Sequence, residues 1–262
     1  MCYRTSNRLP VPNMEKRYKI ERDPELDIED DDFIDYNING FSHPPMLIIG
    51  MNAGIDIGPR PEVLHPALWG IAPSSTKGSI NDYYKGIKYH GSELNARSEK
   101  AFDYWLYKAS IMEKRCIVPV TGFFEPHKHK GVSYPFYFER KNREYLSVAG
   151  LYSVTEIGYV TFTLLTKEAS PLFAKVHNKT GDKRQIVLLN EETEKDWLNP
   201  DLNKEDIKFF FRDHYDEKKL TTYPVSRAVQ GRKNILDGEE AVERDDYEQL
   251  ETLEAELKKF LS

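Results

Sequence analysis

Residue 2 of the chain is a cysteine, directly behind the initiator methionine. Once Met1 is removed, Cys2 carries an α-amine and a thiol on adjacent carbons, and their ordinary pKa values of about 8 and about 8.5 leave both partly reactive near neutral pH. The amine can form a Schiff base with an aldehyde, and the thiol can close that imine into a thiazolidine. In a second chemistry, the thiol attacks an acyl carbon and the amine acts as its base. An ordinary residue at a frayed terminus is the third interpretation.

Glu125 and His177 are the candidates for acid–base chemistry. Glu125 lies in the sequence TGFFEP at the end of an expected strand, where aromatic residues and a proline remove water from the carboxylate. A partly desolvated carboxylate suits proton transfer. His177 lies in a basic loop between an expected short helix and a strand. A lone histidine at such a place is structural or catalytic, and the local sequence leaves both interpretations open.

Other side chains could bind an anion or a nucleic acid. Asn95 and Arg97 precede an expected helix that begins near Ser98, where free backbone N–H groups favour anions. A simple capping loop is the ordinary interpretation of the same residues. Trp69 lies in an apolar run and is either a core aromatic or an exposed platform on which a base stacks.

Charge is distributed unevenly along the chain. The formal net charge is -6, yet residues 21–35 hold nine acidic side chains against Arg22, and residues 237–262 hold ten acidic against three basic side chains. The rest of the chain therefore carries a net charge of +9. A basic body with acidic appendages suits a polyanionic partner, for which phosphate contacts are the usual use of such charge. Simple solvation of the surface is the alternative.

The composition indicates an intracellular protein without a cofactor. No apolar run approaches the ~20 residues that span a bilayer, and the first residues lack the layout of a signal peptide. Cys2 and Cys116 form neither a disulfide framework nor a metal-ligand pattern. His127 and His129 lack carboxylate or cysteine partners, so we interpret them as part of an exposed basic turn. We expect no metal, no organic cofactor, no membrane contact and a reducing, cytoplasmic location, associated with the nucleoid if the source is bacterial.

Hydrophobic periodicity and turn residues predict a mixture of strands and helices. The expected strands are 43–52, 116–120, 134–138, 145–151, 160–166, 186–189 and 222–225, of which 134–138, 145–151 and 160–166 form an antiparallel meander. One expected helix begins near Ser98, and the others cover 170–176, 191–198, 203–211 and the acidic C-terminal segment.

Several short motifs, taken in order, resemble the SRAP family, the SOS-response-associated peptidase-like proteins that process abasic sites in DNA. The likeness covers roughly residues 1–230, and its strongest matches are the Asn-Ala-Arg-Ser-Glu and Gly-Phe-Phe-Glu stretches. The matching residues are Cys2 with Arg4, Trp69-Gly70 with Pro73, Asn95–Glu99, Gly122–Glu125, His177 with Lys183-Arg184, and Tyr223–Val225.

The resemblance implies a reaction and a role for each motif. Cys2, freed of Met1, would form a covalent thiazolidine with the ring-opened sugar of an abasic site in single-stranded DNA. Glu125 would move protons, Asn95 would hold the terminal residue, and His177 would help to open the sugar. Strand scission by an abasic-site lyase reaction and peptidase removal of the protein's own Met1 follow as corollaries. Contacts to the DNA would come from Arg4, Arg97, Arg184 and Trp69.

Two departures from the family pattern affect these expectations. Tyr3 stands where the family commonly has glycine, which adds bulk beside the nucleophile. His177 is followed by a longer loop than the usual Arg-Met-Pro run, so either Arg184 or Lys179 could be the arginine's counterpart.

We therefore expect an α+β fold in which antiparallel strands curl into a barrel-like sheet with peripheral helices. The expected boundaries are a single SRAP-like domain over 1–236, with an acidic insertion at about 21–35, and an acidic C-terminal helix within 237–262 that packs on the body. The expected partner is single-stranded DNA with abasic sites, bound by a monomer.

Two other functions remain open at this stage. In an N-terminal-nucleophile amidohydrolase, the Cys2 thiol attacks an amide with its own amine as base. In a non-catalytic single-strand-binding module, aromatic residues and arginines bind DNA reversibly and Cys2 is dispensable. The substitution Cys2→Ala separates the three functions, because it removes crosslinking, amide hydrolysis or nothing, respectively.

Overall fold

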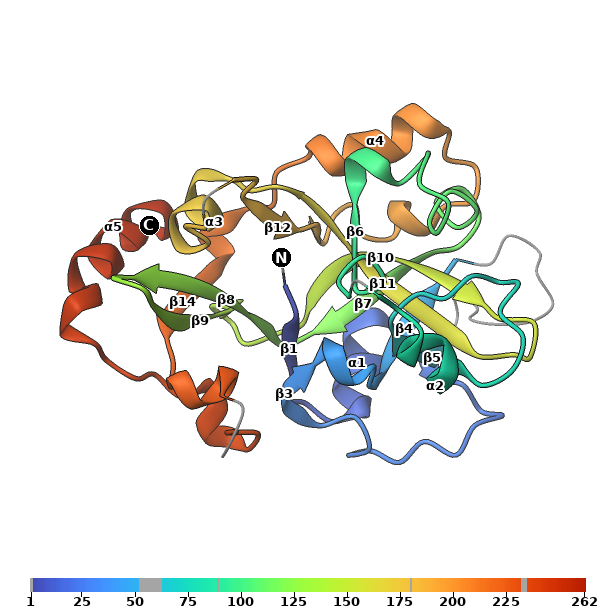
Figure 1. Ribbon diagram of the computed structural model, residues 1–262, viewed down its shortest axis with the longest axis horizontal. Coiled ribbons are helices and arrows are strands. Elements are labelled where there is room, and N and C mark those ends of the chain that lie inside the picture. The colour runs from blue at the N-terminus through green and yellow to red at the C-terminus, as the bar shows by residue number, and fades with distance from the viewer. Residues whose placement is uncertain (1, 52–62, 89, 180, 232–234) are drawn as a thin grey trace.

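The computed structural model describes residues 2–51, 63–88, 90–179, 181–231 and 235–262, and two β-sheets form its centre (Figure 1). The first sheet has five strands in the spatial order β14-β9-β8-β1-β3. All of its pairings are antiparallel. These strands are β14 (Leu220–Pro224), β9 (Val132–Arg140), β8 (Gly122–His129), β1 (Arg4–Asn7) and β3 (Asp35–Asn39).

The second sheet contains a closed barrel. Its strand order is β12-β11-β10-β7-β4-β5-β2, and β11 also pairs with β5, so β11, β10, β7, β4 and β5 form a ring. The strands of this sheet are β12 (Arg184–Ile186), β11 (Val160–Glu168), β10 (Leu146–Val154), β7 (Arg115–Val120), β4 (Pro45–Gly50), β5 (Val63–Trp69) and β2 (Glu21–Arg22). Two short strands join it, β6 (Asn95–Arg97) on β11 and β13 (Leu188–Leu189) on β10.

Helices surround the two sheets. The α-helices are α1 (Val11–Tyr18), α2 (Ile80–Lys85), α3 (Pro171–Val176), α4 (Lys204–Arg212) and α5 (Glu251–Leu261). Short 3-10 helices cover Gly40–Ser42, Ser98–Lys100, Asp196–Leu198, Glu217–Lys219, Arg227–Gln230, Glu239–Val242 and Glu248–Leu250. Within the described ranges, no helix combines the length and the apolar character needed to cross a bilayer.

Both faces of the barrel strands are buried. Ile48 on β4 and Val118 on β7 belong to one hydrophobic cluster, whereas their chain neighbours Ile49 and Ile117 belong to another. Successive side chains of a strand point to opposite faces, so one cluster lies on each side of the barrel wall. This two-sided burial explains why these strands read as nearly continuous apolar runs.

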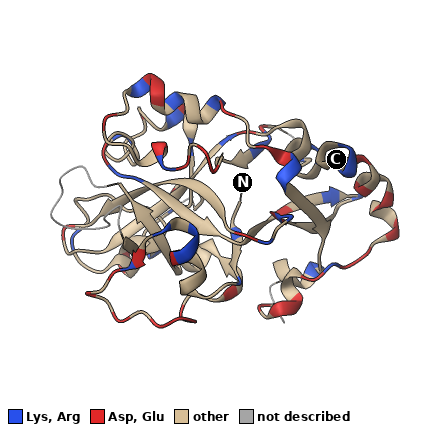
Figure 2. Cartoon of the chain, turned by 180° about the vertical axis from the view of Figure 1, so that it is seen from behind, with Lys and Arg blue, Asp and Glu red and all other residues tan. Residues whose placement is uncertain are grey.

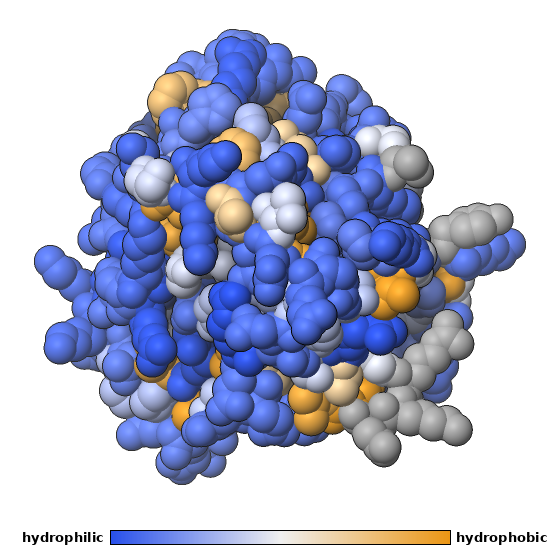
Figure 3. All heavy atoms as spheres, turned by 90° about the vertical axis from the view of Figure 1, so that its left-hand side faces the viewer, coloured by the Kyte–Doolittle hydropathy of each residue, from blue (hydrophilic) through white to orange (hydrophobic). Residues whose placement is uncertain are grey.

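The acidic segments lie at the periphery. Figure 2 shows acidic residues along the loop between β2 and β3 and along the C-terminal segment. In this segment, α5 buries Leu257 and Leu261 against the rest of the chain. The side of the molecule that carries α5 is mostly hydrophilic, with apolar side chains scattered over it (Figure 3).

The expected α+β class with a barrel of largely antiparallel strands and peripheral helices is confirmed. The continuous meander is wrong, because β10 pairs with β11 while β9 pairs with β8 and β14 in the other sheet. The helix expected from Ser98 is a 3-10 turn followed by irregular turns, and the helix expected over 191–198 shortens to Asp196–Leu198. The last residue of the strand expected over 43–52 lies outside the described residues.

Candidate active site

The first described residue of the chain lies beside the strand that carries Glu125. Cys2 lies two residues before the start of β1, which is held between β8 and β3. The register pairs Thr5 with Phe123 of β8 and with Ile38 of β3. Figure 1 shows the N-terminus at the centre of the molecule, between the two sheets, so the sheet pairing fixes a terminus that the sequence alone could leave frayed.

Cys2 is completely buried, at 0% exposure. Its Sγ donates to the Arg4 carbonyl at 3.2 Å, and its own carbonyl accepts from Asn95 Nδ2 at 2.8 Å. Burial, and after it the negative charge of Glu125, raise the pKa of the Cys2 thiol well above its ordinary value. The thiol is therefore protonated at neutral pH, which disfavours it as the first nucleophile. Met1 lies outside the described residues.

Glu125 and His177 form a buried pair. His177 Nδ1 donates to Glu125 Oε2 at 2.7 Å, and the two residues are 7% and 1% exposed. β8 supplies Glu125, and His177 is the C-cap of α3. The end of α3 is fixed by His127, whose Nδ1 donates to the Val176 carbonyl at 3.0 Å. A carboxylate joined to an imidazole in this way has the geometry of an acid–base pair.

Asn95 clamps the N-terminal residue from the opposite sheet. It lies on β6, which pairs in parallel with β11, Leu164 facing Asn95. Its side chain is buried, and while Nδ2 binds the Cys2 carbonyl, Oδ1 forms no hydrogen bond within the described part of the chain. Buried amide oxygens are rarely left without a donor, so Oδ1 is a place where a substrate or a terminal amine would gain a bond.

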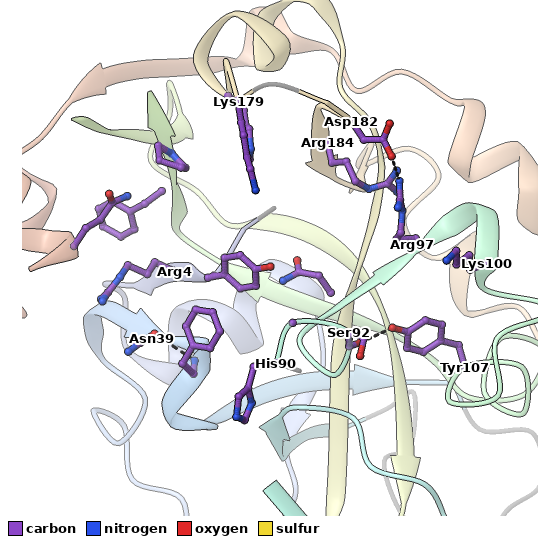
Figure 4. A pocket seen from close by; sticks show the side chains of 18 of the residues that line it. Arg4, Asn39, His90, Ser92, Arg97, Lys100, Tyr107, Lys179, Asp182 and Arg184 are labelled. Carbon is purple, nitrogen blue, oxygen red and sulfur yellow. Dashed lines mark hydrogen bonds and ion pairs between the residues drawn. The ribbon is translucent and has the colours of Figure 1, made fainter. Parts of the chain in front are cut away.

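A cavity of about 720 Å³ opens in front of these residues (Figure 4). Its wall includes Asn95 and His177, whereas Cys2 itself lies behind the wall formed by Tyr3. Aromatic side chains line much of it, and the rings of Tyr3 and Phe41 stack at a centroid distance of 4.7 Å. The wall is formed by Tyr3, Arg4, Asn39, Phe41, His90, Gly91, Ser92, Asn95, Arg97, Lys100, Tyr104, Tyr107, Phe124, Pro126, His177, Lys179, Asp182, Arg184 and Gln230.

The basic residues expected to contact DNA all line this cavity, but they differ in how firmly they are bound within the protein. Arg4 donates to Asn37 Oδ1 at 2.9 Å, and Arg97 pairs with Asp182 at 2.5 Å at a partly exposed position. Lys179 is exposed and reaches into the cavity from the side opposite His90 (Figure 4).

Arg184 is buried at 4% exposure and fully engaged. Its guanidinium donates to both carboxylate oxygens of Glu99 at 2.7 and 2.8 Å and to the carbonyl and hydroxyl of Thr166. This geometry makes Arg184 a residue that fixes β12 to its surroundings. Of the two candidates that follow His177, Lys179 is therefore the better placed to meet a phosphate.

The expectation that Trp69 contacts a base is wrong. Its side chain is 0% exposed, its Nε1 donates to the Leu94 carbonyl at 3.0 Å, and its ring stacks on Phe162 in the core. Tyr3 and Phe41, which are among the aromatic residues that line the cavity, were not among the expected DNA-binding residues. The place of Tyr3 beside Cys2 was a usable signal, whereas nothing in the sequence marks Phe41.

The chain is similar in sequence and fold to known proteins. Residues 1–232 match the family described as SOS response associated peptidase (SRAP). The abasic site processing protein YoqW of Bacillus subtilis (strain 168) is 29% identical over 171 residues, which are 63% of this chain and 70% of YoqW. The abasic site processing protein HMCES of Xenopus tropicalis is 24% identical over 224 residues, 76% of this chain and 63% of that protein.

A crystal structure of a protein from Bacteroides thetaiotaomicron has a similar fold. It superposes with a TM-score of 0.74 at 25% identity, over 94% of this chain and 100% of that one. The match to the family extends over the strands of both sheets and includes Cys2, Asn95, Glu125 and His177. The chain therefore belongs to the SOS response associated peptidase (SRAP) family.

Proposed function

We propose that this protein processes abasic sites in single-stranded DNA by forming a covalent crosslink through Cys2. The observation that carries the proposal is the packing of an N-terminal cysteine against a buried carboxylate–imidazole pair, behind a cavity lined with cations. The relatives named as abasic site processing proteins support the same substrate.

The reaction begins at the α-amine of Cys2 after Met1 has been removed. The amine attacks the C1′ aldehyde of the ring-opened sugar to give a carbinolamine, which loses water to form an imine. The Sγ atom then adds to the imine carbon, and its proton goes to the nitrogen, so a thiazolidine ring closes without an oxidant or reductant. The raised pKa of the Cys2 thiol fits this order, because the amine acts first and the thiol adds only to an activated carbon.

The neighbouring residues have distinct parts in these steps. Glu125 protonates the departing hydroxyl of the carbinolamine and takes up the thiol proton during ring closure. Asn95 holds the Cys2 carbonyl and so fixes the direction of the amine. His177, joined to Glu125, assists sugar opening by polarising its oxygen. The same imine permits β-elimination, so abasic-site lyase activity follows from the mechanism. Peptidase removal of Met1 would be a separate hydrolysis of the Met1–Cys2 amide that precedes these steps.

The cavity wall supplies the binding surface for the strand. Arg4, Arg97 and Lys179 are placed around the opening and would hold phosphates. The stacked pair of Tyr3 and Phe41 offers a flat apolar surface to a base or sugar next to the abasic site.

The amidohydrolase alternative has less support, because it requires the thiol to be the first nucleophile while the burial of Cys2 favours the protonated thiol. The non-catalytic binding module has less support because it leaves the Glu125–His177 pair without a function.

Denaturing gel electrophoresis with single-stranded DNA that carries one abasic site tests the proposal. The wild-type protein should give a slower band that survives denaturant and needs the abasic site, and Cys2→Ala should give none. Cys2→Ser keeps the amine, so its imine should be trapped only when borohydride is added. Cys116→Ala, which changes the other buried cysteine, should crosslink normally. If mass spectrometry shows that Met1 is absent and still no band forms, the proposal fails and amide hydrolysis becomes the next reaction to assay.

A further inference from the structure

A second cluster of ligating side chains lies at the edge of the cavity, apart from Cys2. His43, His90 and Glu93 each offer one ligand atom, and these atoms lie within 4.8 Å of one another. His43 follows the turn after β3, and the other two residues precede β6. Their spacing in the sequence follows no metal-binding motif, and only the fold brings them together.

Glu93 is a buried carboxylate that lacks a strong cationic partner. It is 1% exposed and accepts hydrogen bonds from the Gly91 N–H at 2.8 Å and from His90 Nδ1 at 3.0 Å. Among the described residues, no lysine or arginine forms an ion pair with it, and its only ion-pair partner is the half-exposed His90. Burying a carboxylate without a compensating charge is costly, and a divalent cation would supply that charge.

His43 is held in the form that a metal ligand requires. Its Nδ1 lies 2.9 Å from the Trp69 carbonyl, which can only accept, so in the neutral ring Nδ1 carries the hydrogen and Nε2 keeps a lone pair. A backbone carbonyl bound to the other ring nitrogen is the usual support of a ligating histidine. The ring stacks on Tyr84 at 3.6 Å and presses on Gly70, where a Cβ would approach Nδ1 to 2.4 Å.

We propose that His43, His90 and Glu93 form a binding site for a single zinc ion that clamps the cavity wall. Two imidazoles and a carboxylate are a common zinc ligand set, with water in the fourth position. In a tetrahedral site the ligand atoms are roughly 3.4 Å apart, so side chains separated by no more than 4.8 Å need to close by about an ångström. The half-exposed His90 can make this movement.

The position of the cluster gives the ion a structural effect. It would tie the turn at His43 to the segment that leads into β6 and carries Asn95. Within this segment, Gly91 packs against the Tyr3 hydroxyl, which a Cβ on Gly91 would approach to 3.1 Å. Zinc would thus fix the wall against which the N-terminal residues lie, without taking part in the reaction of Cys2.

Isothermal titration calorimetry with zinc chloride, on the full chain freed of metal by a chelator, tests the site. We expect one ion per chain and, at a hundredfold excess over Kd, a rise in Tm of roughly 5–10 °C. His90→Gln, at a half-exposed position, should weaken binding by at least about tenfold while its Tm in chelator equals that of wild type. Glu93→Gln should also weaken zinc binding by at least about tenfold. His129→Gln is the matched control and should bind zinc as the wild type does.

Cys2 is itself a potential zinc ligand, so the titration is repeated with Cys2→Ala, which should bind one ion with unchanged affinity. Cobalt bound in place of zinc should show no thiolate charge-transfer band. The proposal is overturned if no ion binds, if His90→Gln binds as wild type does, or if Cys2→Ala abolishes binding. The last result would place the ion at the N-terminal thiol.

Discussion

Asn95→Ala should separate positioning of Cys2 from stability of the fold. The substitution removes the bond from Nδ2 to the Cys2 carbonyl, and a buried carbonyl left without a donor costs about 1–3 kcal/mol. It also removes Oδ1, a buried acceptor that forms no hydrogen bond within the described residues and carries a similar cost of about 1–3 kcal/mol. Because the two changes offset each other, we expect the free energy of unfolding to change by no more than about 1 kcal/mol, a Tm shift of roughly 2–4 °C.

The crosslinking rate should respond much more strongly. Without the Asn95 clamp, the α-amine of Cys2 must find its direction of attack during the reaction. If the lost bond, worth about 1–3 kcal/mol, appears in the barrier, the rate falls roughly 5- to 150-fold. Single-turnover crosslinking followed on denaturing gels measures the rate, and calorimetry measures Tm. A wild-type rate would refute the positioning role of Asn95, and a Tm loss above roughly 10 °C would show that Asn95 mainly holds the fold together.

Three further perturbations have expected outcomes. Thr163→Val removes a buried hydroxyl without a hydrogen bond in the described structure, so calorimetry should show a Tm that is unchanged or raised by roughly 2–4 °C; a clear loss would reveal a partner for that hydroxyl. Lys179→Ala should lower the salt dependence of DNA binding by about one phosphate contact and leave Tm unchanged. Arg184→Ala should lower the free energy of unfolding, measured by denaturant titration, by about 2 kcal/mol or more. The reverse pattern would exchange the roles of the two residues. The pKa of the Cys2 thiol is higher in the folded than in the unfolded protein, so the thiol stabilises the fold below about pH 8.5, and this contribution is lost above that pH at up to about 1.4 kcal/mol per pH unit. Cys2→Ala should therefore show a shallower decline in Tm at alkaline pH. An identical decline would contradict the burial of this thiol.

The fold was predictable for strands that are buried on both faces and for elements whose ends are marked by capping or turn residues. The strand at β7 follows from the apolar run 116–120, and that at β11 from β-branched and aromatic residues over 160–166. Asn203 marks the start of α4 through a capping box. The assignment of β9 to the other sheet was not predictable, because strand partners depend on contacts that are distant in the sequence. The segment after Ser98 forms turns in place of the expected helix, and Trp105 and Met112, which lie at helical spacing in it, are 57% and 37% exposed, so this spacing does not mark a buried face here.

The candidate site was predictable as a set of residues but not as a set of contacts. Cys2, Glu125 and His177 are marked by their types and neighbours, yet the 2.7 Å contact between Glu125 and His177 depends on β8 meeting the end of α3. Trp69 was misassigned because aromatic type alone does not distinguish a stacking platform from a core residue. The His43 cluster follows no spacing rule, since its three residues come together only where two loops meet.

Under the proposed mechanism, the burial of Cys2 would let one residue be both protected and reactive. A thiol that stays protonated is a poor nucleophile toward oxidants and soft electrophiles, so the Cys2 thiol would react little in the absence of an aldehyde. An imine formed at the adjacent amine brings an electrophilic carbon within the same residue, and the high effective concentration of an intramolecular reaction then compensates for the low thiolate fraction. Glu125, whose charge contributes to the high pKa of this thiol, is also the nearby base that can accept its proton. In the proposed reaction, the same electrostatic coupling that suppresses ionisation of the free thiol would therefore support ring closure once the substrate is bound.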